Sequence, residues 1–299
     1  MSLLAWIQGP AAETEAAGQV NLGELIMHHL TDARELELPF FLGTVHLPQG
    51  WTLNLGPLGA VDLAPTKHVV LMLIAALLCV AVFIPPARAA RRRDEGAAPR
   101  GLGGGMEAMV LYFRDEVVRA NIGHGADAYV PYILTLFFFI LFMNLLGLVP
   151  WGGSATGNLA VTAGLALCSF VLVEISGMRA LGLRGYLHTI FYAPEGMAGI
   201  GKVLMLVLMT PVELMGKLTK PFALTVRLFA NMTAGHTLIF ALGGLVFVFA
   251  NIFAAGGAAV VTAAMATGVM VLEVLVAFLQ AFIFAMLTAV FVGLIRHAH

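Results

Sequence analysis

Long runs of apolar residues without any charged side chain dominate the chain. Asp127 and Glu174 enclose 46 residues that carry no charge. Arg227 and Glu273 enclose another 45, and a further 22 follow before Arg296. A helix needs about 20 mainly apolar residues to cross the hydrocarbon core of a bilayer. The pattern therefore predicts an all-α integral membrane protein with several crossings.

The sequence divides into five consecutive parts. Residues 1–66 are predicted to form an acidic tail, because they carry seven Asp or Glu residues and a single arginine. A second part, 67–127, begins with a crossing at about 67–84 that Pro85-Pro86 is expected to end, since proline lacks the N–H a helix needs. The other predicted parts are crossings two and three in 128–178 (about 129–149 and 159–178), a loop at 179–198 and a last apolar segment at 199–299.

The pattern changes between the first two crossings. Residues 94–105 are polar and rich in glycine, which predicts a linker. Apolar side chains then recur at helical spacing from Met106 through Phe113 to Val117, with charged side chains between them. This spacing predicts an amphipathic helix over 106–121 that lies at the membrane interface.

The charges indicate an orientation. Four arginines, at positions 88, 91, 92 and 93, follow the first crossing, and the positive-inside rule places them in the cytoplasm. The acidic tail then lies outside, and five crossings bring the C-terminus inside. Because 60% of the residues are hydrophobic and only 11% are charged, a soluble fold and a basic nucleic-acid-binding face are excluded. The two cysteines lie in apolar runs, which excludes a disulfide framework.

The last apolar segment is too long for simple crossings. From residue 199 to 297 it is broken only near 251–257, which leaves arms of about 45 and 40 residues. A perpendicular span needs only about 20 residues, or about 30 Å at 1.5 Å per residue. The two arms therefore predict a long C-terminal helical hairpin that is strongly tilted or lies partly in the membrane plane.

Arg227 is the charged residue in this hairpin that most needs an explanation. No acidic residue lies within ten positions of it on either side. A charge at the bilayer centre costs about 2.5–3.5 kcal/mol on insertion scales. A guanidinium keeps its proton in proteins, so Arg227 suits a permanent cation in a polar cavity and not a proton carrier. The alternatives are a structural ion pair with Glu213 or Glu273, or snorkelling to an interface.

Two further polar residues share a helical face with Arg227. Glu213 precedes it in the same arm, and Asn231 follows it by one helical turn. The separations of Arg227 and Asn231 from Glu213 are both close to whole numbers of turns, at about 3.6 residues per turn. The first arm of the hairpin therefore carries a polar stripe of Glu213, Arg227 and Asn231.

The register of the hairpin predicts pairs across its two arms. For a turn centred at about residue 254, His236 precedes the centre by almost the same number of positions as Glu273 follows it. Arg227 and Gln280 are likewise almost equally far from the centre on opposite arms. A His–Glu pair can exchange protons near neutral pH. The alternative is a buried pair that only holds two helices together.

Other polar residues are assigned ordinary roles. Lys217 and Lys220 are expected to snorkel to the cytoplasmic interface, and Glu174 to lie at that interface too. Asn144 and Asn158 flank the turn between crossings two and three, where the favoured role is helix capping and the alternative is the mouth of a water-filled cavity. The sequence has no cluster with metal-ligand spacing, no phosphate-binding loop and no nucleophile–base set, so no cofactor, metal or catalytic site is expected.

Several of these stretches resemble the signatures of one known family. Lys220-Pro221, residues 227–232 (RLFANM) and Ala234-Gly235-His236 closely resemble the first signature of subunit a of F-type ATP synthase. Residues 279–284 (LQAFIF) are similar to the second signature, and residues 142–150 and 106–118 are similar to other parts of the family. The resemblance covers about residues 67–299.

The resemblance implies a proton-channel stator of the membrane sector Fo, in a bacterial inner membrane. Two offset half-channels would lead to the carboxylate of a rotating ring of c subunits. Arg227 matches the arginine that attracts this carboxylate and blocks direct leakage between the half-channels. Asn231 and Gln280 match polar residues near that arginine, and Glu213 matches a carboxylate of the cytoplasmic half-channel.

His236 and Glu273 match a pair in the outer half-channel that some family members carry in the opposite order. The exchange implies that the two positions work as a unit. Gly147 departs from members that have an acidic residue before the proline, so Asn144 or water is expected to take that role here. The implied partners are the c-ring, the peripheral-stalk b subunits, the F1 sector indirectly and the lipid bilayer, with no nucleic acid.

Two other classes of protein remain as alternatives. An independent secondary transporter or ion channel usually shows internal repeats of its helices, and none is visible in the sequence. A structural membrane scaffold would leave Arg227 and Glu273 unexplained. Protons are favoured over Na⁺ as the transported ion because a His–Glu pair titrates near neutral pH.

Overall fold

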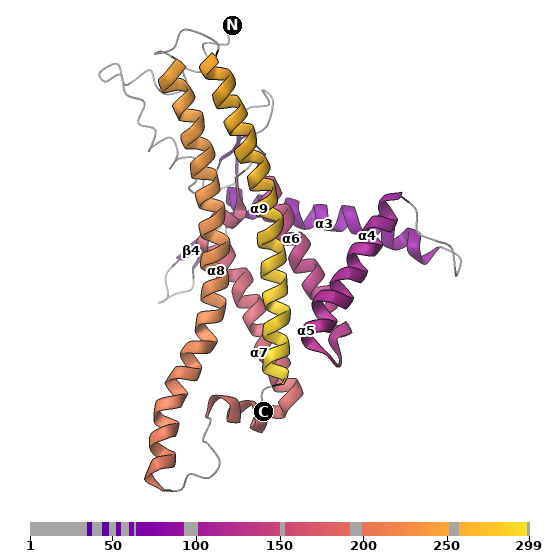
Figure 1. Cartoon of the computed structure of the whole chain (residues 1–299), viewed down its shortest axis with the longest axis vertical. Helices are drawn as coiled ribbons and strands as arrows, with labels where there is room; N and C mark the ends of the chain where they lie inside the picture. The colour runs from indigo at the N-terminus through magenta and orange to yellow at the C-terminus, as the bar shows by residue number, and fades with distance from the viewer. Residues whose placement is uncertain are drawn as a thin grey trace.

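The chain forms an assembly of long helices (Figure 1). The predicted all-α class is confirmed, and short β-hairpins are added near the N-terminus. The computed structural model describes residues 35–37, 44–47, 52–54, 60–62, 64–92, 101–149, 153–191, 199–250 and 257–297.

Most of the predicted acidic tail lies outside the described residues. The described part of it forms two short antiparallel hairpins, which the helical prediction did not include. Strand β1 (Glu35–Glu37) pairs with β2 (Thr44–His46), and β3 (Thr52–Asn54) pairs with β4 (Ala60–Asp62).

The first long helix, α3 (Lys67–Arg91), runs past the predicted stop. It contains both Pro85 and Pro86, so the prediction that they end the helix is wrong. The fixed backbone angle φ of proline suits a helix, and the main loss is the hydrogen bond of its missing N–H. Here the loss falls near the exposed C-terminal end, where little packing depends on it.

Helix α4 (Gly101–Tyr112) also begins earlier than predicted. Residues 101–105 belong to this helix and not to a linker, because extending an existing helix costs far less than starting one. The chain continues as a π-helical stretch, Phe113–Arg119, and the short helix α5 (Ala120–Ile122). The side chains of Phe113, Val117, Val118 and Ile122 are buried, as an amphipathic helix requires.

An ion-pair cluster closes the polar side of this amphipathic region. Arg119 donates hydrogen bonds to both carboxylate oxygens of Asp127, at 2.9 Å each, and Arg114 donates a third at 3.3 Å. These bonds, chiefly those from Arg119, lower the pKa of Asp127 to about 2. Asp127 therefore stays ionised, and the cluster stays formed, well below neutral pH.

The next two helices begin close to the predicted residues but end at different ones. Helix α6 spans Val130–Gly147 and α7 spans Leu159–Ile190. The predicted loop from 179 is wrong up to residue 190, because α7 continues through a kink at Gly182. The φ of 69° at Gly182 is a conformation that glycine adopts without strain, so the chain bends there and resumes the helix.

The predicted C-terminal hairpin consists of α8 (Ile200–Ala250) and α9 (Gly257–Arg296). The two helices run antiparallel and side by side, whereas α3 runs across their direction (Figure 1). Most of the predicted turn, 251–256, lies outside the described residues. If α3 crosses a bilayer, this arrangement tilts α8 and α9 strongly within it, as their lengths predict.

The core lies where α6 packs against α3, α9 and the amphipathic region. The rings of Phe113, Phe137 and Phe138 contact one another in a row, with centroid distances of 4.6 and 4.8 Å, the first pair tilted and the second edge-to-face. Glycines allow two of the closest helix contacts. A Cβ on Gly177 of α7 would lie 2.7 Å from Ile295 of α9, and a Cβ on Gly293 of α9 would overlap the carbonyl oxygen of Asn121.

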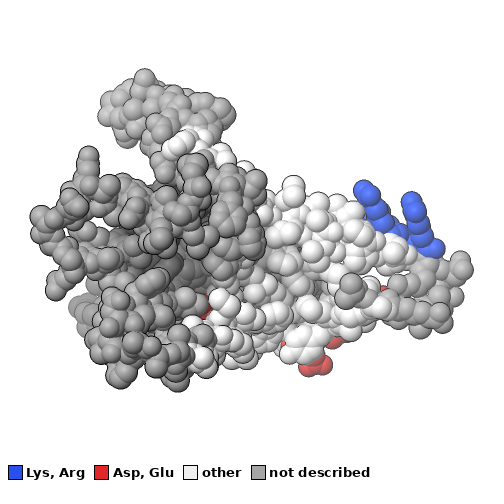
Figure 2. Space-filling model, turned by 90° about the horizontal axis from the view of Figure 1, so that it is seen from above, with Lys and Arg blue, Asp and Glu red and all other residues white. Residues whose placement is uncertain are grey.

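In the part of the chain that the structure describes, four helical segments are long and apolar enough to cross a membrane. They are α3, α6, α7 and residues 264–296 of α9. The first part of α8 carries Glu213, Lys217, Lys220 and Arg227, whereas its residues 228–250 carry no charge. The fifth predicted crossing falls on α8, and its charged part depends on neighbours that accommodate these charges. Figure 2 shows a face whose described surface is mostly uncharged, with basic side chains gathered at one end.

Candidate functional site

The polar stripe predicted on α8 lies at its contact with α9. Arg227 and Asn231 are both exposed, while Leu224 and Leu228 beside them are buried against the other helices. Gln280 of α9 lines the same narrow gap as Arg227. At this level the hairpin has the register that a turn near residue 254 predicts.

Arg227 has no carboxylate partner among the described residues. The alternative of an ion pair between Arg227 and Glu213 or Glu273, all of which the structure describes, is therefore wrong. The gap beside Arg227 has no room for a water molecule. Each of the two carboxylates lines a separate cavity on a different side of this gap. Arg227 is thus a cation without an ion-pair partner, placed between two cavities that each contain a carboxyl group.

The cavity at Glu273 lies between α6, α8 and α9. It has a volume of about 220 Å³, and its polar lining consists of Asn144, Asn231, Glu273 and Gln280. Both carboxyl oxygens of Glu273 are buried without a hydrogen-bond partner among the described residues. A buried carboxyl group is costly unless it is protonated or solvated, and this volume accommodates several water molecules.

His236 lies beside this cavity and is tied to backbone carbonyl groups. Its Nδ1 atom is 3.0 Å from the carbonyl oxygen of Met232, and its Nε2 atom is 2.8 Å from that of Gly147. A carbonyl oxygen can only accept a hydrogen bond, so a ring nitrogen that carries a proton donates it, and a doubly protonated ring donates to both carbonyl groups. The ring is close enough to Glu273 for a Coulombic interaction.

Asn144 does not cap a helix, which was its favoured role, but lines the Glu273 cavity, which was the alternative. Its side-chain amide donates to the carbonyl oxygen of Ala277 at 3.2 Å, and its oxygen accepts from Thr156 at 2.7 Å. It thereby joins α6 to α9 at the wall of the Glu273 cavity. An amide in the middle of an apolar run was the available signal. Asn158 does cap α7, since its oxygen accepts from the N–H of Ala160 at 2.8 Å.

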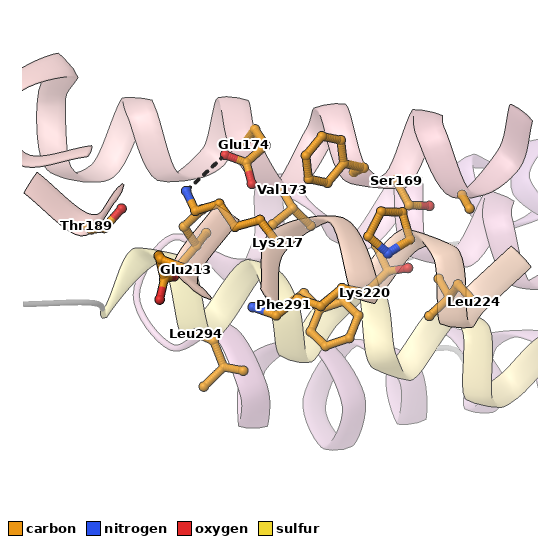
Figure 3. A pocket seen from close by; sticks show the side chains of 15 residues that line it. Ser169, Val173, Glu174, Thr189, Glu213, Lys217, Lys220, Leu224, Phe291 and Leu294 are labelled. Atoms are coloured by element: carbon orange, nitrogen blue, oxygen red, sulfur yellow. Dashed lines mark hydrogen bonds and ion pairs between the residues drawn. The ribbon is translucent and has the colours of Figure 1, made fainter. Parts of the chain in front are cut away.

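The second cavity lies at Glu213, between α7, α8 and α9 (Figure 3). It has a volume of about 250 Å³, and its lining includes Glu174, Glu213, Lys217 and Lys220. Glu213 is exposed, and the described residues offer it no ion pair. Its carboxylate is therefore open to water in the cavity.

Lys217 and Glu174 are not the interface residues that the sequence predicted. The side chain of Lys217 is 8% exposed and that of Glu174 is 13% exposed, and they form an ion pair at 3.4 Å. Snorkelling is therefore wrong for Lys217. The two residues are far apart in the sequence and lie on different helices, so no local sequence signal could have paired them. Lys220 is exposed, with its ammonium group 5.3 Å from the ring centre of Phe291.

These features define a class of protein. Membrane-length helices, two separate cavities that each contain a carboxyl group, and a permanent cation between them are typical of an ion-translocating membrane subunit. The family described as ATP synthase A chain matches residues 69–293, and the chain belongs to this family.

Curated relatives agree with this assignment. The chain is 43% identical to ATP synthase subunit a of Chloroherpeton thalassium over 268 residues, which is 90% of this chain and 75% of the relative. It is 48% identical to that of Myxococcus xanthus over 239 residues, 79% of this chain and 74% of the relative. The family places the chain in Fo as a multi-pass proton-channel stator subunit of a bacterial ATP synthase, without a catalytic site of its own.

Proposed function

We propose that the two cavities are the two half-channels of the proton path and that Arg227 separates them. One observation carries this proposal: along α8, a cavity at Glu213 is followed by a gap closed to water at Arg227 and then by a cavity at Glu273. Leu224 borders the first cavity and the gap, and Leu228 borders the gap and the second cavity. A proton in one cavity therefore reaches the other only on an external carrier.

The external carrier in this proposal is a carboxyl group on a c-ring. Besides the exposed Arg227 and Asn231, the hairpin exposes large apolar side chains, which include Phe222, Val226 and Leu275. Such a surface suits a helical ring that presents one carboxyl group within an apolar face. The permanent charge of Arg227 attracts the deprotonated carboxylate and favours release of its proton. Ring rotation then delivers the carboxylate from one half-channel to the other.

The proposed orientation follows from the basic segment after α3. Arg88, Arg91 and Arg92 lie at the C-terminal end of that helix, which the positive-inside rule assigns to the cytoplasm. The N-terminus is then periplasmic, the C-terminus cytoplasmic, and the membrane is the bacterial inner membrane. The half-channel at Glu213 opens to the cytoplasm and the one at Glu273 to the periplasm. The peripheral-stalk b subunits and, indirectly, F1 complete the set of proposed partners.

Glu273 and His236 have different parts in the outer half-channel. The carboxyl group of Glu273 faces the cavity and exchanges protons with its water. When His236 takes up a proton, its ring donates hydrogen bonds to the carbonyl oxygens of Met232 and Gly147. Its charge stabilises the ionised form of Glu273 and so helps that carboxyl group to pass its proton on.

This function predicts that both residues are needed and that their order can be exchanged. We expect Glu273→Gln and His236→Gln each to reduce ATP-driven proton pumping in inverted membrane vesicles severely. The exchanged variant, His236→Glu with Glu273→His, is expected to pump faster than either single variant. It keeps one carboxyl and one imidazole group, and a protonated carboxyl at 236 can still donate to the carbonyl oxygen of Gly147.

Controls come from exposed residues outside the cavities. Glu116→Gln and His124→Gln remove the same chemical groups from exposed positions, so pumping should stay near that of the unmodified complex. Full pumping by both single variants at 236 and 273 would show that the pair has only a structural role. The proposed outer half-channel would then be wrong.

A further inference from the structure

Lys217 is held by two residues of α7 and forms no ion pair with a carboxylate on its own helix. Its ammonium group lies 3.4 Å from Oε2 of Glu174 and 4.3 Å from the centre of the Tyr186 ring. The hydroxyl group of Tyr186 donates a hydrogen bond to the same oxygen of Glu174. The contact between Lys217 and Glu174 crosses the wall of the Glu213 cavity (Figure 3).

A different partner is available to Lys217 on α8. Glu213 lies four residues earlier, one helical turn away, and a Glu followed by a Lys at this spacing is the favoured order for an ion pair along a helix. The structure instead joins Lys217 to Glu174 across the helix contact. Glu213 lines the same cavity without an ion pair among the described residues.

We infer that Glu174 and Tyr186 are positioning residues that keep Lys217 away from Glu213, so that Glu213 stays free to exchange protons. The inference rests on the proposed function, in which Glu213 serves the cytoplasmic half-channel. An ion pair with Lys217 would hold Glu213 in its ionised form and make it a poor acceptor of protons. The contact across α7 and α8 thus determines which of the two carboxylates in the cavity can titrate.

Few other charges face Glu213. From α8 they are Lys217 and Lys220, and the ammonium group of Lys220 lies over the ring of Phe291. From α7 the titratable groups of the cluster are Glu174 and Tyr186. The lining from α9 carries no charge; it consists of Thr288, Phe291, Leu294 and Ile295. Lys217 is therefore the cation whose position changes when the cluster is altered.

The test uses the complete ATP synthase complex in inverted vesicles, whose external solution bathes the cytoplasmic face. ATP-driven pumping takes protons up from that side, so its rate against external pH reports on Glu213. In Glu174→Gln, Lys217 loses its charged partner and pairs with Glu213. We expect the half-maximal rate on the alkaline side to move to lower pH by about one unit, the lower end of the range for a carboxylate beside a cation.

A double variant separates positioning from damage to the fold. Glu174→Gln with Lys217→Gln removes the released cation as well, so its pH profile is expected to return to that of the unmodified complex. A merely structural loss would persist or grow in the double variant. Tyr186→Phe, which removes only one hydrogen bond to Glu174, should give a smaller shift in the same direction. Glu116→Gln is the control for removing an exposed carboxylate.

The outcomes distinguish this inference from the function on which it rests. If Glu213→Gln pumps normally at every external pH, Glu213 carries no protons and the proposed cytoplasmic half-channel fails. If Glu213→Gln is impaired but Glu174→Gln keeps an unchanged pH profile, only the positioning of Lys217 is refuted. A shift in the single variant that the double variant does not reverse also overturns the inference. A shift that the double variant reverses supports it.

Discussion

Replacement of Arg227 by alanine is expected to abolish ATP-driven proton pumping while the complex stays assembled. The proposed path depends on a permanent cation at the closed gap between the two cavities, and alanine provides no charge there. Arg227 is exposed and has no ion pair among the described residues. Its removal therefore leaves no buried carboxylate unpaired in that part of the chain, and the fold should persist.

The measurement compares pumping in inverted vesicles with the amount of the subunit that copurifies with the complex. Arg184→Ala removes an arginine from an exposed position on α7 and should leave pumping intact. Arg227→Lys is a stricter variant, since lysine keeps a charge but lacks the planar guanidinium fork. Normal pumping by Arg227→Ala would refute the barrier between the half-channels. An equal loss of pumping in Arg184→Ala would also refute the barrier, because the effect would then not depend on where the arginine lies.

Replacement of Gly293 by valine is expected to prevent stable folding of the subunit. A Cβ at this position of α9 would overlap the backbone carbonyl oxygen of Asn121, at the end of the amphipathic region. Backbone cannot move aside as a flexible side chain can, so the helices must separate. Overpacking of a core costs about 1–3 kcal/mol, and a contact with backbone should reach or exceed the upper end of that range.

Gly268 provides the matched control on the same helix. It is exposed, and a Cβ there meets nothing within 4 Å, so Gly268→Val should accumulate in membranes like the unmodified chain. The readouts are the amount of subunit in purified complex and its thermal unfolding midpoint in detergent. Equal stability of the two variants would contradict the close contact between α5 and α9.

The positions of the helices could be predicted from the sequence, but several of their ends could not. Apolar runs without charge identify membrane helices because burying a charge in lipid is costly. The ends of these helices depend on smaller contributions to the free energy. Pro85 and Pro86 continue α3 because the hydrogen bonds they remove lie in an exposed part of the helix. Gly182 continues α7 because glycine accepts the backbone angle of a kink.

The candidate site was predictable where it depends on simple geometry. Counting outward from a turn places Gln280 beside Arg227, because both helices of a hairpin rise equally per residue. The contact between Lys217 and Glu174 was not predictable, because it depends on how α7 packs against α8. Six residues of the polar stripe and of the predicted pairs have proposed roles in transport: Glu213, Arg227, Asn231, His236, Glu273 and Gln280. These roles stay predictions until transport is measured.

The polar character of α8 has a consequence for how the subunit enters the membrane during synthesis. Glu213, Lys217, Lys220 and Arg227 lie in the first part of this helix, whereas its residues 228–250 carry no charge. The charged part leaves the ribosome first, and a segment with several charges partitions poorly into lipid. Its insertion is therefore expected to wait for the uncharged residues 228–250 that follow it in the same helix.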